Sequence, residues 1–235
     1  ILPEGTRFAW IVDGQQRSTA LSKSQNDTLN VPVIGFHCPD IETQRAQFIL
    51  VNKARPLPRN LIDELLPEIN SPMPSDLSKR KIPSELVNAL GRTEGSPFFG
   101  IIKRPSDPVD KKGIITDTAL IKVTESSLNN YGALSLYKGV GKIPDDLNGM
   151  YEIMYCFWDA VREVFPDAWG LPSTDSRLMH SAGIQAMGNL MDRIVPRMPR
   201  NKNMKANIIL SLTKICDDCA WTEGEWDFGM SWNAI

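Results

Sequence analysis

Five consecutive residues near the start of the chain carry side chains that suit nucleotide chemistry, namely Asp13, Gly14, Gln15, Gln16 and Arg17. Arg17 can donate a forked pair of hydrogen bonds to phosphate oxygens, and Asp13 can hold Mg²⁺ or orient a water molecule. Gly14 permits a tight turn and a close approach of phosphate to the backbone, while the two glutamines supply neutral donors and acceptors. We therefore predict a nucleotide-phosphate site. Asp13, Gln16 and Arg17 would act in catalysis, and Asp13 would also hold the metal ion. Gly14 and Gln15 would bind the nucleotide.

The residues around this pentad predict a strand, a tight turn and a helix N-terminus. Residues 8–12 are apolar and β-prone, and residues 15–21 suit a helix. Anions bind at a helix N-terminus because it presents unpaired backbone N–H groups and the positive end of the helix dipole. Ser18 and Thr19 add hydroxyl groups there and are further candidates for binding the nucleotide. The alternative is that the pentad is a polar turn that only caps a helix.

The remaining sequence predicts an α/β (α+β) domain over residues 1–140, followed by a helical region over residues 141–235. Apolar, β-branched runs predict strands at residues 31–36, 98–102 and 114–115. Residues 70–112 are rich in Pro, Ser and Lys, and we expect them to be partly mobile.

Helices are expected at residues 40–51, with Asp40 as the N-cap, and at residues 59–66. A further capped helix should begin near Asp117, although Ile121 and Val123 also suit a strand. In the C-terminal region, two sets of apolar residues recur at helical spacing. They are Met150, Ile153, Phe157, Val161 and Val164, and then Leu178, Met179, Ala182, Met187, Leu190 and Ile194. We interpret both as faces that pack into a core and not as a cofactor site.

The composition is typical of a soluble globular protein, with 42% hydrophobic and 23% charged residues. No apolar run is long enough to cross a bilayer, and the first residues lack the pattern of a signal peptide, so we expect a cytoplasmic protein with no membrane contact. The formal net charge of -2 argues against binding nucleic acid by bulk electrostatics. A local basic stripe between Arg193 and Lys205 could still touch a phosphate backbone, or could be a solvated loop.

The four cysteines are expected to be free thiols. Only Cys216 and Cys219 have the spacing of metal ligands, and His37 with Cys38 is the one conceivable second pair for a zinc ion. We favour a cysteine pair at a helix end over a zinc site.

Residues 8–21, FAWIVDGQQRSTAL, resemble the signature of the DGQHR-domain family. A second block, with Arg45, Phe48 and the sequence VNKARPL at residues 51–57, resembles that family's pattern of Arg, Phe, Asn and Pro-Leu. The resemblance implies a ParB/sulfiredoxin-like mixed-sheet fold that binds and hydrolyses ATP. It also implies that Asn52 and Lys53 approach the nucleotide from a facing helix end, where a lysine suits phosphate. Gln16 stands where the usual pentad has histidine, so no imidazole is available there as a general base.

Later segments are similar to DndB-like subunits of 7-deazaguanine DNA-modification systems, at residues 96–98, 113–120, 178–190 and 221–226. This similarity implies an ATPase that uses Mg²⁺ and acts with a transglycosylase-like DNA-modification subunit, which exchanges guanine for a deazapurine. The chain would then reach DNA through that partner.

Two alternatives stay open for the function. An NTP-dependent DGQQR-type restriction nuclease would nick plasmid DNA in the presence of Mg²⁺. A DndB-like DNA-binding transcriptional regulator would shift DNA in a gel in a salt-dependent manner.

Overall fold

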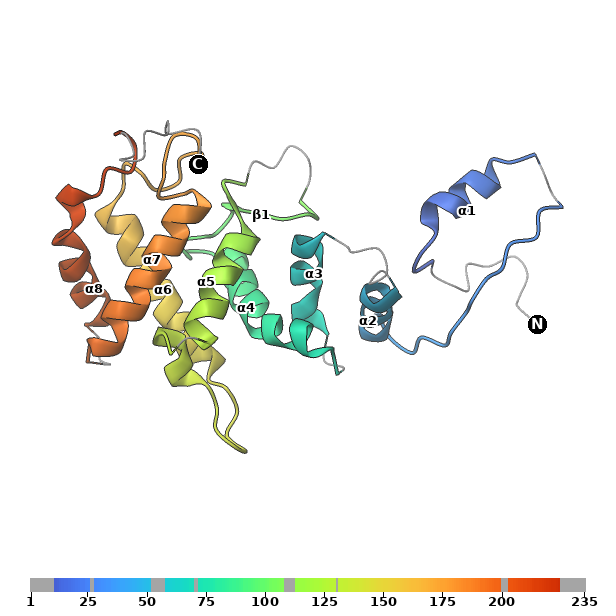
Figure 1. Ribbon diagram of the computed structural model, residues 1–235, viewed down its shortest axis with the longest axis horizontal. Helices are drawn as coiled ribbons and strands as arrows, with labels where there is room; N and C mark the ends of the chain where they lie inside the picture. Colours follow the sequence, from blue (N-terminus) through green and yellow to red (C-terminus); the bar gives the residue numbers. More distant parts are fainter. Residues whose placement is uncertain are drawn as a thin grey trace.

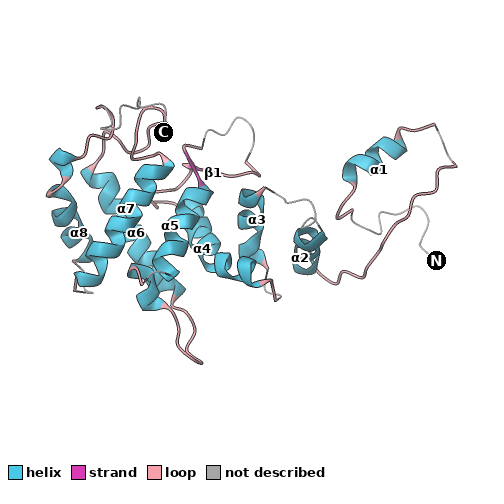
Figure 2. Ribbon diagram, in the orientation of Figure 1, coloured by secondary structure: helices cyan, strands magenta, loops and turns pink. Residues whose placement is uncertain are grey.

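The computed structural model describes residues 11–25, 28–51, 58–69, 72–107, 113–129, 131–199 and 203–224. These residues form a mixed α/β structure in which helices dominate (Figures 1 and 2). The α-helices are α1 (Gln15–Ser22), α2 (Ile41–Val51), α3 (Arg59–Leu65), α4 (Ser75–Arg92), α5 (Asp117–Asn129), α6 (Leu147–Val164), α7 (Ser181–Ile194) and α8 (Met204–Thr213). Short 3₁₀ turns are η2 (Leu66–Glu68), η3 (Ala133–Tyr137), η4 (Val195–Arg197) and η5 (Cys216–Asp218). Strands β1 (Ile102–Lys103) and β2 (Ile115–Thr116) pair in parallel.

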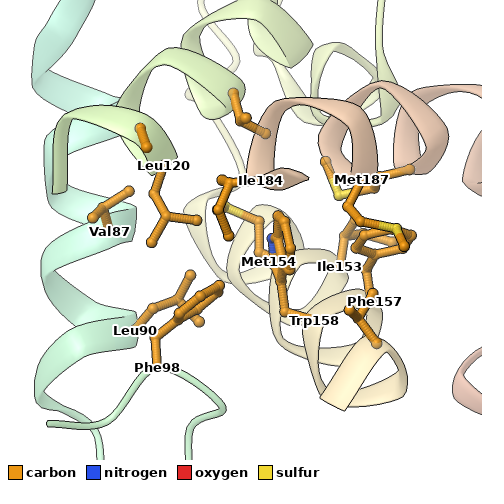
Figure 3. Close-up of a cluster of buried hydrophobic side chains, with 14 of the residues drawn as sticks. Val87, Leu90, Phe98, Leu120, Ile153, Met154, Phe157, Trp158, Ile184 and Met187 are labelled. Atoms are coloured by element: carbon orange, nitrogen blue, oxygen red, sulfur yellow. The ribbon is translucent and has the colours of Figure 1, made fainter. Parts of the chain in front are cut away.

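The main core lies between α4, α5, α6, α7 and α8, where α5 packs on α7 and α6 packs on α8. Figure 3 shows Val87 and Leu90 of α4 facing the α6 side chains around Trp158. The close approach of α5 and α7 depends on Gly188, because a Cβ atom there would overlap the side chain of Val123. A bulkier residue would therefore push the two helices apart.

This core is continuous from Leu86 to Leu212, so it includes elements on both sides of residue 140. Residue 140 lies in the loop between η3 and α6, and helices on both sides of it contribute to this core. A second, smaller cluster joins α2, η2 and the start of α4, through Ala46, Ile49, Leu66, Ile69 and Leu77. Helix α1 buries no side chain and lies at the far end of the molecule from α8 (Figure 1).

Most of the predicted helices are confirmed. Asp40 caps α2, since the backbone N–H of Thr43 donates to its Oδ1 atom at 2.7 Å, and α3 occupies the second predicted span. Helix α5 begins at Asp117 as predicted, directly after β2, so the alternative strand through Ile121 and Val123 is wrong. The first apolar face of the C-terminal region lies on α6, and all of its residues except Val164 are buried. The second is confirmed in part: Leu178 and Met179 are buried but precede α7, Met187 is buried on α7, and Ala182 is exposed.

The strand predictions are largely wrong. Residues 31–36 form no strand, and Val33 and Ile34 are 86% and 94% exposed. A β-prone run becomes a strand only where another strand accepts its backbone hydrogen bonds, and no neighbouring strand within the described part of the chain pairs with this one. Residues 11 and 12 are not in a strand either, and residues 8–10 lie outside the described residues.

Residues 72–107 are the described part of the segment expected to be partly mobile. They contain α4, an 18-residue helix with Pro83 inside it. The strand expected at residues 98–102 is reduced to the pair Ile102–Lys103, while Phe98 is buried in a turn before it. Among the described residues, no helix is long and apolar enough to cross a membrane.

Candidate functional site

The pentad forms a left-handed bend at the start of α1. Gly14 has φ 88° and ψ 19°, a conformation that favours glycine because it has no Cβ atom. The side chain of Asp13 accepts a hydrogen bond from the Gly14 N–H at 2.7 Å, and the Gly14 carbonyl accepts one from the Ser18 N–H at 2.8 Å. The bend and the helix N-terminus predicted from the sequence are therefore both present, and they lie next to each other.

Arg17 is turned back onto this bend. Its Nη2 atom donates to Asp13 Oδ2 at 3.0 Å, and its side chain is 78% exposed. The same Nη2 atom would lie 3.4 Å from a Cβ atom built at Gly14, so the guanidinium covers the glycine. An exposed ion pair of this kind contributes only about 0.2–1 kcal/mol. An incoming phosphate could therefore replace Asp13 as the partner of Arg17 at small cost.

The other pentad candidates have different surroundings. Gln15 donates from Nε2 to the Ile11 carbonyl at 2.9 Å, which ties the segment before the bend to the helix. The Thr19 hydroxyl donates to the Gln15 carbonyl at 2.9 Å and so serves the helix backbone. Gln16 and Ser18 are exposed on α1. The structure thus brings Asp13, Gly14 and Arg17 together.

Two further predicted binding residues, Asn52 and Lys53, lie outside the described residues. For Mg²⁺, the bend supplies the single carboxylate of Asp13, and no group of three His, Cys, Asp or Glu side chains gathers in the described ranges. Protein-bound Mg²⁺ usually takes one or two carboxylates, with substrate phosphates and water completing its shell. One carboxylate beside a phosphate site therefore fits this chemistry.

A groove with a volume of about 390 Å³ lies between α7 and η5. It is lined by Ala186, Met187, Asn189, Leu190, Arg193, Ile215, Cys219 and Trp221. None of these residues belongs to the pentad. The bend at Gly14 is therefore an open surface feature and not part of this groove.

The basic stripe between Arg193 and Lys205 is partly neutralised. Lys205 Nζ contacts Asp159 Oδ2 at 2.5 Å and Glu163 Oε2 at 2.9 Å, and these carboxylates raise the pKa of Lys205. Arg197 donates to the carbonyl of Arg193 on the same helical segment. The two ion pairs of Lys205 reduce the charge that this residue offers to a phosphate backbone.

A buried group of charged side chains, which the sequence analysis did not identify, joins α3, α4 and α5. Arg80 donates from Nε and Nη2 to the two carboxylate oxygens of Asp63, at 2.8 and 2.6 Å, and from Nη1 to Glu125 at 3.3 Å. The bonds to Asp63 raise the pKa of Arg80. Arg80 lies one turn after Leu77 on the buried face of α4. A helix prediction for this segment would have placed it in the core.

The same region holds the loop after β1. Glu64 accepts hydrogen bonds from the backbone N–H of Ser106, at 3.2 Å, and from its hydroxyl group. Burial, followed by the charge of Arg92, lowers the pKa of Arg104, whose Nη2 atom packs against Gly91. These contacts fasten the loop to the helices. The group is enclosed and mostly paired within itself, so its role is structural.

Asp117, at the start of α5, provides a pH-dependent test of this buried region. Burial raises its pKa above the ordinary value of 3.8, against the opposing hydrogen bond from Thr118. Above pH 3.8 the folded state therefore binds more protons than the unfolded state, and this group costs more stability as the pH rises through its folded pKa. We expect Asp117→Asn, which keeps the acceptor for Thr118, to be more stable than the wild type at pH 7. The gain should shrink towards pH 3.8, as measured by urea unfolding.

The control for this substitution is Asp76→Asn, which removes an exposed carboxylate in the first turn of α4. It should show no gain in stability at pH 7. An Asp117→Asn protein whose stability relative to the wild type is the same at pH 4 and pH 7 would contradict the argument.

Comparisons with protein-family models, with curated proteins and with solved structures found no match to this chain.

Proposed function

We infer that this chain binds ATP at the Asp13–Arg17 bend and hydrolyses it in support of a DNA-modification reaction. The observation that carries the proposal is the meeting of three features at one exposed point: a glycine in a left-handed conformation, the N-terminus of α1, and the guanidinium of Arg17. Each of these features favours a bound phosphate.

In this proposal the ion pair between Asp13 and Arg17 is the resting state of the site. The triphosphate replaces Asp13 as the hydrogen-bond partner of the Arg17 guanidinium. The N–H groups of the first turn of α1 face the same anion. Asp13, released from Arg17, is then free to hold Mg²⁺, which would neutralise charge on the phosphates. Gln16 is exposed beside the bend and can orient the attacking water through its amide. Water attacks the γ-phosphorus atom, and the bond to the ADP oxygen breaks.

The wider context of this activity follows from the resemblance. It supports a ParB/sulfiredoxin-like arrangement around the bend and a cytoplasmic ATPase subunit, whose transglycosylase-like partner inserts a 7-deazaguanine base into DNA. The net charge of -2 supports contact with DNA through that partner and not through this chain alone.

Two substitutions at the bend should have opposite effects on nucleotide binding. Arg17→Ala should weaken ATP binding by about 2–3 kcal/mol, because the charge-assisted hydrogen bonds to phosphate are lost. Asp13→Asn keeps an acceptor for the Gly14 N–H but removes the carboxylate that competes for Arg17. Without Mg²⁺ it should bind ATP up to about fivefold more tightly, which corresponds to loss of a surface ion pair. With Mg²⁺ it should hydrolyse ATP more slowly.

Titration calorimetry with ATP, with and without Mg²⁺, and release of labelled phosphate measure these effects. Lys23→Ala is the matched control, because it removes a cation at the opposite end of α1. ATP affinity and turnover like those of the wild type in both bend variants would refute the proposal.

A further inference from the structure

Cys216 and Cys219 stand at the two ends of a single tight turn. The turn is η5, and its closing hydrogen bond runs from the Cys219 N–H to the Cys216 carbonyl at 3.1 Å. In a 3₁₀ turn, residues three apart lie one above the other, and the rise of about 2.0 Å per residue places their Cα atoms about 6 Å apart. A disulfide requires Cα atoms about 4.4–6.8 Å apart. The backbone therefore already holds these cysteines in the range that a disulfide needs.

Both cysteines are free thiols at the edge of the main core, and both are partly accessible. The Cys216 thiol contacts the Val164 carbonyl at 3.8 Å, at the end of α6. Cys219 lines the groove between α7 and η5, beside Trp221. Burial raises the pKa of Cys219, and the nearby Cys216 raises it further. The two sulfur groups are thus close enough to influence each other.

The described residues bring no third candidate zinc ligand to this pair. His37 and Cys38, the second ligand pair considered from the sequence, lie on the extended segment before α2, which is far from η5 (Figure 1). A structural zinc ion takes four ligands, and no cluster of three candidate ligands occurs in the ranges that the structure describes. The η5 turn, by contrast, brings the two cysteines close to each other.

We propose that Cys216 and Cys219 form a reversible disulfide by exchange with small-molecule disulfides. The thiolate of Cys216 attacks one sulfur of the small disulfide, whose S–S bond breaks and releases one thiolate. The thiolate of Cys219 then attacks the Cys216 sulfur of this mixed disulfide and releases the second. The protein dithiol loses two electrons, the small disulfide is reduced to two thiols, and the two cysteine protons pass to the leaving thiolates.

Cys219 takes part in the new bond whichever thiolate attacks first. Oxidation also changes the groove between α7 and η5, because Cys219 contributes to its wall. The disulfide therefore links the redox state of the surroundings to the shape of that groove.

The test uses the full chain in buffers with a series of ratios of reduced to oxidised glutathione. After quenching with an alkylating reagent, trypsin releases both cysteines in one peptide that begins at Ile215, because no Lys or Arg follows Lys214. We expect this peptide to lose two hydrogens and to resist alkylation. The exposed Cys38 is the internal control, which should carry a glutathione adduct instead.

The contribution of the fold is measured by repeating the series in guanidinium chloride. The ratio of reduced to oxidised glutathione at half oxidation gives the equilibrium constant for disulfide formation. We expect this constant to be at least about tenfold larger in the folded chain than in the unfolded chain. In Cys219→Ser, Cys216 should accumulate as the mixed disulfide. The proposal would be overturned by equal equilibrium constants for disulfide formation in the folded and unfolded chains. It would also be overturned by glutathione adducts on Cys216 and Cys219 in the wild type.

Discussion

Arg80→Met is expected to lower the free energy of unfolding by about 3–5 kcal/mol, because it leaves Asp63 buried without the partner that compensates its charge. The side chain of Asp63 is completely buried, and both of its carboxylate oxygens accept hydrogen bonds from Arg80. Methionine fills similar space in the core but donates no hydrogen bond. The effect is measured by urea unfolding, followed by the circular dichroism of the helices.

The double variant Arg80→Met with Asp63→Leu separates two free energies. One is the net contribution of the ion pair to stability, and the other is the destabilisation caused by an unpaired buried charge. The double variant should be more stable than Arg80→Met alone, since the fully buried carboxylate of Asp63 is removed together with its partner. Arg45→Met is the matched control, because Arg45 pairs with Glu68 at a half-exposed site. That control should lose no more than about 1 kcal/mol. An Arg80→Met protein as stable as this control would show that the buried pair contributes little.

Trp158→Ala should cost about 3–5 kcal/mol of stability, because it opens a cavity at the centre of the main core. Trp158 is fully buried on α6. Its ring meets Phe98 at 5.2 Å and Phe157 at 5.4 Å between centroids, both edge to face. Figure 3 shows these side chains between α4, α6 and the turn before β1. The substitution therefore removes contacts with several elements at once.

Trp158→Phe provides the control for this prediction. It keeps an aromatic ring at the centre of the core and removes the buried Nε1–H group, which has no hydrogen-bond partner. We expect a loss of less than about 2 kcal/mol, since the smaller ring gives up some packing while an unsatisfied donor disappears. Thermal unfolding of the three proteins checks the order of stability. If Trp158→Ala and Trp158→Phe lost the same stability, the cavity left by removing the aromatic ring would not be the cause of the loss.

The sequence by itself determined the helices whose apolar residues recur with the helical period. The stripes on α6 and α7 were predicted because an amphipathic helix needs one apolar face against a core and shows it locally. The cap at Asp40 was predicted for a similarly local reason, since one side chain satisfies a nearby backbone N–H. The bend at Gly14 could also be read from the pentad. These features depend on residues within a turn or two of each other.

The tertiary structure alone decided the features that depend on distant partners. Residues 31–36 have the composition of a strand, but a strand needs another segment to accept its hydrogen bonds. Helix α4 contains Pro83 and many polar residues, and packing against α5 and α6 offsets the cost of that proline. Arg80 pairs with Asp63, 17 residues earlier in the chain, because α3 packs against α4. Pairing across long sequence separations is set by which surfaces meet, and no local pattern of residues records it.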